Sequence, residues 1–290
     1  MEDLLRPIYQ ERAGNPGTLG ILLIEKKHEF SASTDNFDVI LFVIAEELEM
    51  PWYVKHYEFQ DKKAALHLVE EHQVKEWILE GSHRRAVDWV LNGQVLFERN
   101  EYIAKERERL REFPPADRKY RMGVEFAKLI RRFTEGKELY ESQHYLDAYN
   151  NIVHALHHLA RLSVIENGFH PEVTVWNQVK RIEPEIYKLY QELVESDESL
   201  QKKIELLLLA SEYSINSRTR TGAAHMLDVI SSQEGLWSFG DLMNKAELKS
   251  YSVDLGAMLE HLIDKGLVED VEVETKGKGI FHRKYKAKEI

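Results

Sequence analysis

The chain has 290 residues, enough for two or three domains, and its lack of cysteine excludes disulfides, thiolate zinc sites and cysteine nucleophiles. Hydrophobic residues make up 43% and charged residues 31%, which is typical of a soluble protein, so we expect a cytoplasmic location and no membrane partner. The formal net charge of −11 argues against a general nucleic-acid binder, because non-specific affinity comes from cations that neutralise phosphates.

Residues 1–103 alternate short apolar runs with turn residues, which predicts a mixed α/β domain. The first helix should end at the breaker cluster Gly14-Asn15-Pro16-Gly17. The expected elements are a helix over 4–12, strands over 19–24 and 39–44, a hairpin of 53–59 and 64–69, a helix over 74–91 and a strand over 95–97.

Residues 104–217 show no strand pattern and predict an all-helical middle domain, with helices over 146–162, 173–193 and 200–213. His154 and His158 are four residues apart in the first of these helices, so they share a face and could ligate one metal ion. The alternative is that these histidines pack or form hydrogen bonds within a helical interface.

Residues 218–290 predict a winged helix-turn-helix domain. Short helices are expected over 223–231, 238–246 and 252–265, with Ser238 and Ser252 as N-caps and Gly266 as the stop. Strands over 267–273 and 280–285 then flank Lys276-Gly277-Lys278-Gly279 and form the wing.

The C-terminal domain carries the most basic segment, with six basic residues against one acidic residue in the last 15. A wing that carries lysine and glycine suits contact with the DNA backbone, while the third helix would enter the major groove. Three acids, Asp254, Glu260 and Asp264, oppose DNA reading by that helix, so a protein partner or a second copy of the chain is the alternative. The residues expected to contact DNA are Lys249, Ser252, Lys276, Lys278, Arg283 and Lys284.

Small polar and acidic residues, Ser33-Thr34-Asp35-Asn36-Phe37-Asp38, run directly into the apolar strand that begins at Val39. Two acids spaced i, i+2 at the start of a strand point to the same side and can reach one Mg²⁺ ion. Acids and asparagine before a strand are also ordinary turn residues, which is the alternative.

The sequence resembles the nucleotidyltransferase superfamily, and most closely the bacterial nucleotidyltransferase-like proteins, which join such a domain to a helical domain and a C-terminal helix-turn-helix. The resemblance covers the whole chain and includes Gly81-Ser82-His83-Arg84-Arg85, Asp88-Trp89, Gly93-Gln94-Val95-Leu96-Phe97 and Trp176-Asn177-Gln178-Val179-Lys180. It implies an α/β domain over 1–103, a helical bundle over 104–217 and a winged helix over 218–290.

The motif of the superfamily is altered in this chain. In its Asp-x-Asp pattern, Asn36 takes the first position and Asp38 the second, while Asp35 comes one residue early and would need a bulge to come into phase. The run Glu25-Lys26-Lys27 stands where a Gly-Ser pair is expected, and His67 stands near the position of the third acid.

Three functions follow from this frame. The resemblance implies first a degenerate domain that binds a nucleotide or serves as a scaffold, coupled to a winged helix that contacts DNA or a partner. Alternatively, an active enzyme would transfer a nucleotidyl group with Mg²⁺ on the catalytic residues Asp38 and Asp35. Ser82, Arg84 and Arg85 would then hold the triphosphate, although they are equally consistent with a solvated helix start. The third function is a transcriptional regulator that senses a ligand.

Overall fold

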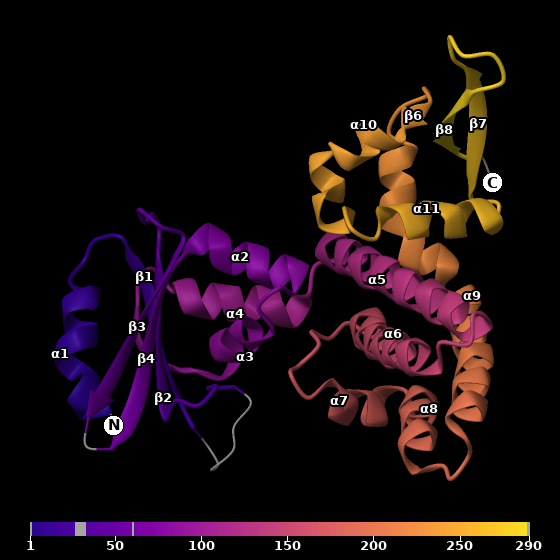
Figure 1. Ribbon diagram of the computed structural model, residues 1–290. Helices are drawn as coiled ribbons and strands as arrows, with labels where there is room; N and C mark the ends of the chain where they lie inside the picture. The colour runs from indigo at the N-terminus through magenta and orange to yellow at the C-terminus, as the bar shows by residue number, and fades with distance from the viewer. Residues whose placement is uncertain (1, 27–32, 60, 289–290) are drawn as a thin grey trace. The chain divides into compact units, whose positions relative to one another are not determined.

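The computed structural model describes residues 2–26, 33–59 and 61–288 and divides into two compact units (Figure 1). The first unit comprises Met1–Pro114 and Gly168–Thr174, and the second comprises Pro115–Asn167 and Val175–Ile290. In the described part of the chain, no helix is both long and apolar enough to cross a membrane.

The first unit is built on a five-stranded sheet in the order β3-β4-β2-β1-β5. Strand β2 is an unbroken apolar run that is buried on both faces, and it pairs in parallel with β4, whereas the other pairs are antiparallel. The strands are β1 (Thr18–Glu25), β2 (Val39–Ala45), β3 (Trp52–Phe59), β4 (Lys62–Glu70) and β5 (Gln94–Glu98).

Helix α1 (Glu2–Ala13) covers one face of this sheet, and α2 (Glu71–Glu80), α3 (Arg84–Asn92) and α4 (Tyr102–Glu112) cover the other (Figure 1). The single helix expected over 74–91 is wrong. Gly81 adopts a left-handed conformation with φ of 64° and ends α2, because glycine takes this conformation at little cost. The break places Ser82 and His83 in a loop before α3.

The second unit begins with five helices, and residues 102–230, all of which the structure describes, contain no strand. The expected helix over 173–193 is two helices, because Pro184 cannot continue the preceding one and begins the next. The first of the five helices was not predicted. They are α5 (Pro115–Glu141), α6 (Tyr145–Glu166), α7 (Val175–Ile182), α8 (Pro184–Glu195) and α9 (Leu200–Ile230).

The winged helix-turn-helix follows, with a three-stranded sheet in the order β6-β8-β7. The separate helix expected over 223–231 is wrong, because these residues continue α9, which also runs through the expected boundary at 217. The elements are β6 (Trp237–Ser238), α10 (Phe239–Met243), the 3-10 helix η1 (Ala246–Tyr251), α11 (Leu255–Asp264), β7 (Val268–Glu274) and β8 (Phe281–Ala287).

The two expected N-caps of this region have different outcomes. Ser238 caps α10 in a capping box with Asp241, as predicted. Ser252 is not an N-cap, because α11 begins only after Asp254.

The winged helix and the helical part share one hydrophobic core, and α11 lies along α5 (Figure 1). Gly123 of α5 permits the close approach of η1, since a Cβ atom there would lie 1.9 Å from Oη of the buried Tyr251, the last residue of η1. Asp254, which is 4% exposed, forms an ion pair with Arg131 of α5. The winged helix is therefore fixed to the helical part.

Candidate functional site

Asp35 lies in a turn before β2, where its backbone has a φ of 51°. Arg85 holds its carboxylate with two nitrogens: Nη1 donates to Oδ2 over 2.6 Å, and Nη2 contacts Oδ1. Such a two-pronged contact is the strong geometry for a guanidinium and a carboxylate. The negative charge of Asp35 is thus neutralised within the protein.

Helix α3 positions this contact. Arg85 lies in its first turn, and one turn later the buried Trp89 donates its indole Nε1–H to the carbonyl oxygen of Ser33 over 2.7 Å. Both bonds run from α3 to the turn before β2, so the helix fixes the conformation of that turn.

Asp38 forms hydrogen bonds with β4 at the point where the parallel pairing of β2 and β4 begins. Its carboxylate Oδ2 accepts the backbone N–H of Lys63 over 2.8 Å, and its own N–H donates to the carbonyl of Lys63 over 2.8 Å. Its carbonyl accepts the N–H of Lys26, while Lys27 lies outside the described residues. The register of β2 against β4 is regular from Val39 to Ala45, and Asp35 lies in the preceding turn and not in the strand.

His67 lies on β4, where it pairs with Phe42 of β2. It is the residue that the sequence placed near the position of the third acid. Trp52 Nε1–H donates to its Nδ1 over 3.3 Å, and the Trp89 ring lies 4.9 Å away. Burial, together with the charges of His83 and His56, lowers the pKa of His67 to about 4. A neutral imidazole therefore stands here at neutral pH.

An aromatic cluster surrounds His67, and the sequence reading missed most of it. His83 stacks on Trp77 at 4.4 Å between ring centroids and lies 5.1 Å from Trp89. Burial also lowers the pKa of His83, and both Asp35 and Arg85 act on the pKa values of His83 and His67. The ion pair and the two histidines thus form one site, which we call the front site. The sequence feature that could have indicated this cluster is the presence of three tryptophans in this domain.

The front site does not suit Mg²⁺. The ion prefers several carboxylate or water oxygens in octahedral geometry. Asp35 is bound to Arg85, Asp38 accepts a backbone N–H, and His67 offers a nitrogen in place of a third carboxylate. Among the residues that the structure describes, no three His, Asp or Glu side chains form a group that could hold a metal ion.

The predicted triphosphate clamp is not assembled either. Ser82 and Arg84 are exposed between α2 and α3, and Arg84 has no ion-pair partner in the described part of the chain. Arg85 is directed to Asp35 instead. Of the three predicted clamp residues, Ser82 and Arg84 are the two that remain exposed.

The predicted DNA-contacting residues do not form one basic patch. Lys276 and Lys278 are exposed in the wing turn, whereas Arg283 on β8 is held by Glu260 of α11 and Asp270 of β7 over 2.7 and 3.0 Å. Lys284 is half-buried on β8, and Lys249 and Ser252 are exposed near η1.

The acidic residues of β7 offset the positive charge of the basic residues of β8. Over residues 268–288 six cations face four carboxylates, and Glu269 pairs with Lys286 over 3.2 Å. The exposed residues of α11 include Glu260 and Asp264, two of the three acids that were expected to oppose DNA reading. Asp254 contributes nothing to that face, contrary to expectation, because it is buried against Arg131.

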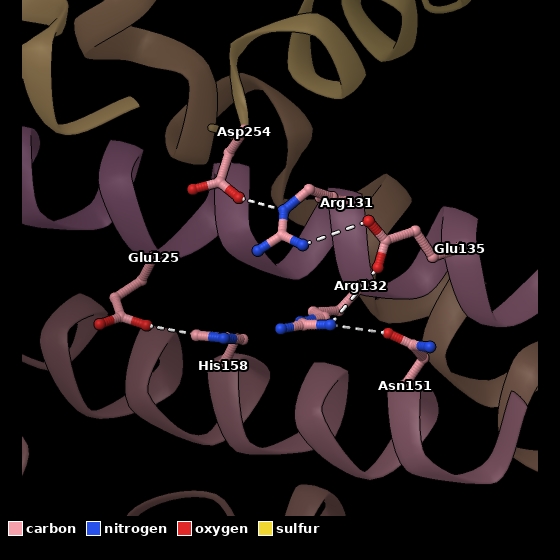
Figure 2. A network of polar contacts seen from close by, with 7 residues as sticks. All are labelled: Glu125, Arg131, Arg132, Glu135, Asn151, His158 and Asp254. Carbon is pink, nitrogen blue, oxygen red and sulfur yellow. Dashed lines mark hydrogen bonds and ion pairs between the residues drawn. The ribbon is translucent and has the colours of Figure 1, made fainter. Parts of the chain in front are cut away.

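Among the described residues, His154 and His158 belong to no group of three side chains that could hold a metal ion. His158 Nδ1 bonds to the Glu125 carboxylate over 2.8 Å, and His154 is exposed one turn away (Figure 2). The alternative expectation, a hydrogen bond within the interface of two helices, is confirmed for His158.

Three family models match successive parts of the chain: nucleotidyltransferase-like over 1–118, YgxA-like substrate binding domain over 119–218, and helix-turn-helix domain over 224–287. The uncharacterized protein YgxA of Bacillus subtilis (strain 168) is 51% identical over 288 residues, which cover 99% of this chain and 98% of that protein. The crystal structure of a nucleotidyltransferase-like protein from Exiguobacterium sibiricum 255-15 superposes with a TM-score of 0.81 at 40% identity, over 99% of both chains.

Proposed function

The chain belongs to the family of nucleotidyltransferase-like proteins that includes Bacillus subtilis YgxA, and on this premise we propose that its first unit is a scaffold without metal-dependent transferase activity. The observation that carries this proposal is the ion pair between Arg85 and Asp35. A guanidinium beside a carboxylate repels a divalent cation and fills the coordination sites that the cation would use.

Calorimetric titration of the full chain with ATP, GTP, CTP and UTP, with and without Mg²⁺, tests the scaffold. We expect no nucleotide to bind in a way that requires Mg²⁺, and we expect Asp38→Ala to leave the titrations unchanged. Weak binding without Mg²⁺ that Arg84→Met removes would identify a non-catalytic nucleotide site at the start of α3. Mg²⁺-dependent binding that is lost in Asp38→Ala would contradict the proposal and favour the enzyme.

For the winged helix, we propose contact with a protein partner rather than sequence reading of DNA. The exposed acids of α11 and the ion pairs of Arg283 with Glu260 and Asp270 carry this choice. Charged groups that are already paired release few counterions from DNA, so they add little affinity.

Fluorescence anisotropy with a short labelled duplex at several salt concentrations tests this choice. If the two exposed wing lysines act alone, the slope of log affinity against log salt is about −2, and Lys276→Gln with Lys278→Gln abolishes it. A much steeper slope, or loss of binding in Lys249→Gln, would show that the helix-turn-helix engages DNA as a whole and would contradict the proposal.

A further inference from the structure

Helices α5 and α6 face each other through a row of polar residues, which we call the α5–α6 seam. Glu125 contacts His158, and Arg132 contacts Asn151 (Figure 2). The second contact lies seven residues later in α5 but seven residues earlier in α6, so the two helices run antiparallel. Spacings of three and four residues place each set on one side of its helix. The seam comprises Arg121, Glu125, Lys128 and Arg132 of α5 and Asn151, His154, His158 and Arg161 of α6.

The floor of the seam is buried and is centred on Glu125, which is 4% exposed. His158 contacts its carboxylate at 2.8 Å, Arg161 at 3.7 Å and Arg121 at 3.8 Å. Burial would raise the pKa of Glu125, but the hydrogen bond from His158 and the charges of the two arginines hold it below its usual value. Glu125 is therefore an anion that orients the surrounding groups.

The mouth of the seam contains cations and histidines. Lys128 and Arg132 are partly exposed, and His154 is exposed. Arg132 donates to Asn151 Oδ1 over 2.9 Å and lies near Glu135, while Lys128 has no ion pair among the described residues. His158 uses Nδ1 for Glu125, so Nε2 is the ring nitrogen that remains for another contact.

Nearby cations act on both histidines at this mouth. Burial lowers the pKa of His154, and the charges of Arg132 and Arg161 lower it further. Burial likewise lowers the pKa of His158, although Glu125 opposes the shift, and Arg161 and Lys128 add to it. Four basic side chains and two histidines therefore meet along the seam, together with the carboxylate of Glu125 at its floor and that of Glu135 beside Arg132 at its mouth.

We propose that the mouth of the α5–α6 seam binds the phosphate group of a small phosphate ester or a pyrophosphate. Lys128 and Arg132 supply the charge from α5, and His154 and His158 complete the site from α6. Phosphate offers several acceptor oxygens and a double charge, which suit donors that converge from two helices. The inference rests on the seam alone and does not depend on the scaffold role of the first unit.

Calorimetric titration of the full chain with inorganic pyrophosphate at low salt tests the proposal. We expect one saturable site, weakened about tenfold or more by Lys128→Met and by His154→Ala, as is usual when one charge-assisted contact is lost. Lys137→Met is the matched control, because Lys137 is exposed on the same helix outside the seam and pairs with Glu212. Circular dichroism verifies that each variant folds.

Three outcomes would overturn the proposal. The first is that the wild-type chain shows no saturable binding. In the second, Lys137→Met weakens binding as much as Lys128→Met, which would reveal general surface attraction. In the third, Arg84→Met abolishes binding while Lys128→Met does not, which would place the phosphate at α3 of the first unit. Failure at the seam leaves the proposal for the first unit untouched, because that proposal is tested with Asp38→Ala.

Discussion

At the scale of single residues, the two adjacent arginines of α3 have different environments. Arg85 holds Asp35, whereas Arg84 is exposed and has no ion pair in the described part of the chain. We expect Arg85→Met to lower the free energy of unfolding of the first unit by about 1 kcal/mol, since the pair is partly exposed and doubly bonded. Arg84→Met should change it by less than about 0.5 kcal/mol. Urea unfolding followed by tryptophan fluorescence measures both, and equal effects would contradict the assigned roles.

The neutral His67 gives the first unit a pH dependence. Its pKa is about 4 in the folded chain and about 6.5 when unfolded, so the unfolded state binds more protons between these values. The stabilisation from His67 is therefore fully present above about pH 6.5 and is lost as the pH falls towards 4. We expect His67→Gln to unfold with a smaller loss of stability over this range than the wild-type chain. Identical pH profiles would contradict the burial of a neutral imidazole.

At the scale of elements, the docking of η1 on α5 depends on a glycine. A Cβ atom at Gly123 would lie 1.9 Å from Tyr251 Oη, whereas nothing lies within 4 Å of one at Gly256. We expect Gly123→Ala to lower the free energy of unfolding of the second unit by roughly 1–3 kcal/mol through overpacking. Gly256→Ala, within α11, should be neutral or stabilising by up to about 1 kcal/mol.

A second substitution separates this clash from a general effect on α5. Tyr251→Phe removes the hydroxyl, and the next atom, Cζ, is 3.1 Å from the added Cβ. The double variant Gly123→Ala, Tyr251→Phe should therefore lose less stability than the two single changes added together, although Tyr251→Phe alone breaks the contact with His225. Simple additivity in thermal unfolding would show that η1 does not rest on Gly123.

The sequence predicted elements well where one periodicity held throughout. The hairpin of β3 and β4, the strand β2 and the wing strands all follow from apolar alternation or runs bounded by turn residues. It failed where one residue interrupts an apolar run, as at Gly81 and Pro184. It also failed in α9, where a change of pattern from Arg218 onward suggested a boundary, yet α9 continues through this point and Thr219 and Gly222 are buried.

At the scale of the whole molecule, the architecture was predictable and the chemistry of the sites was only partly so. The sequence identified Asp38 as the acid that the motif keeps, Asp35 as an acid out of phase, and His67 as the residue near the position of the third acid. It could not reveal that Asp35 meets Arg85, because 50 residues separate them and only the packing of α3 on the sheet brings them together. The pairing of Arg283 with Glu260 and Asp270 is likewise tertiary, and it changes a predicted DNA contact into an internal ion pair.

The central claim is that the altered motif of the first unit binds no divalent metal ion. Titration with Mn²⁺, followed by electron paramagnetic resonance, tests this claim most directly. Mn²⁺ accepts the same oxygen ligands as Mg²⁺. The resonance signal of the free ion falls as Mn²⁺ binds, so it measures the bound fraction. We predict that the wild-type chain and Asp38→Ala give the same titration curve. A saturable site in the wild-type chain that disappears in Asp38→Ala would contradict the scaffold and restore the metal-dependent enzyme.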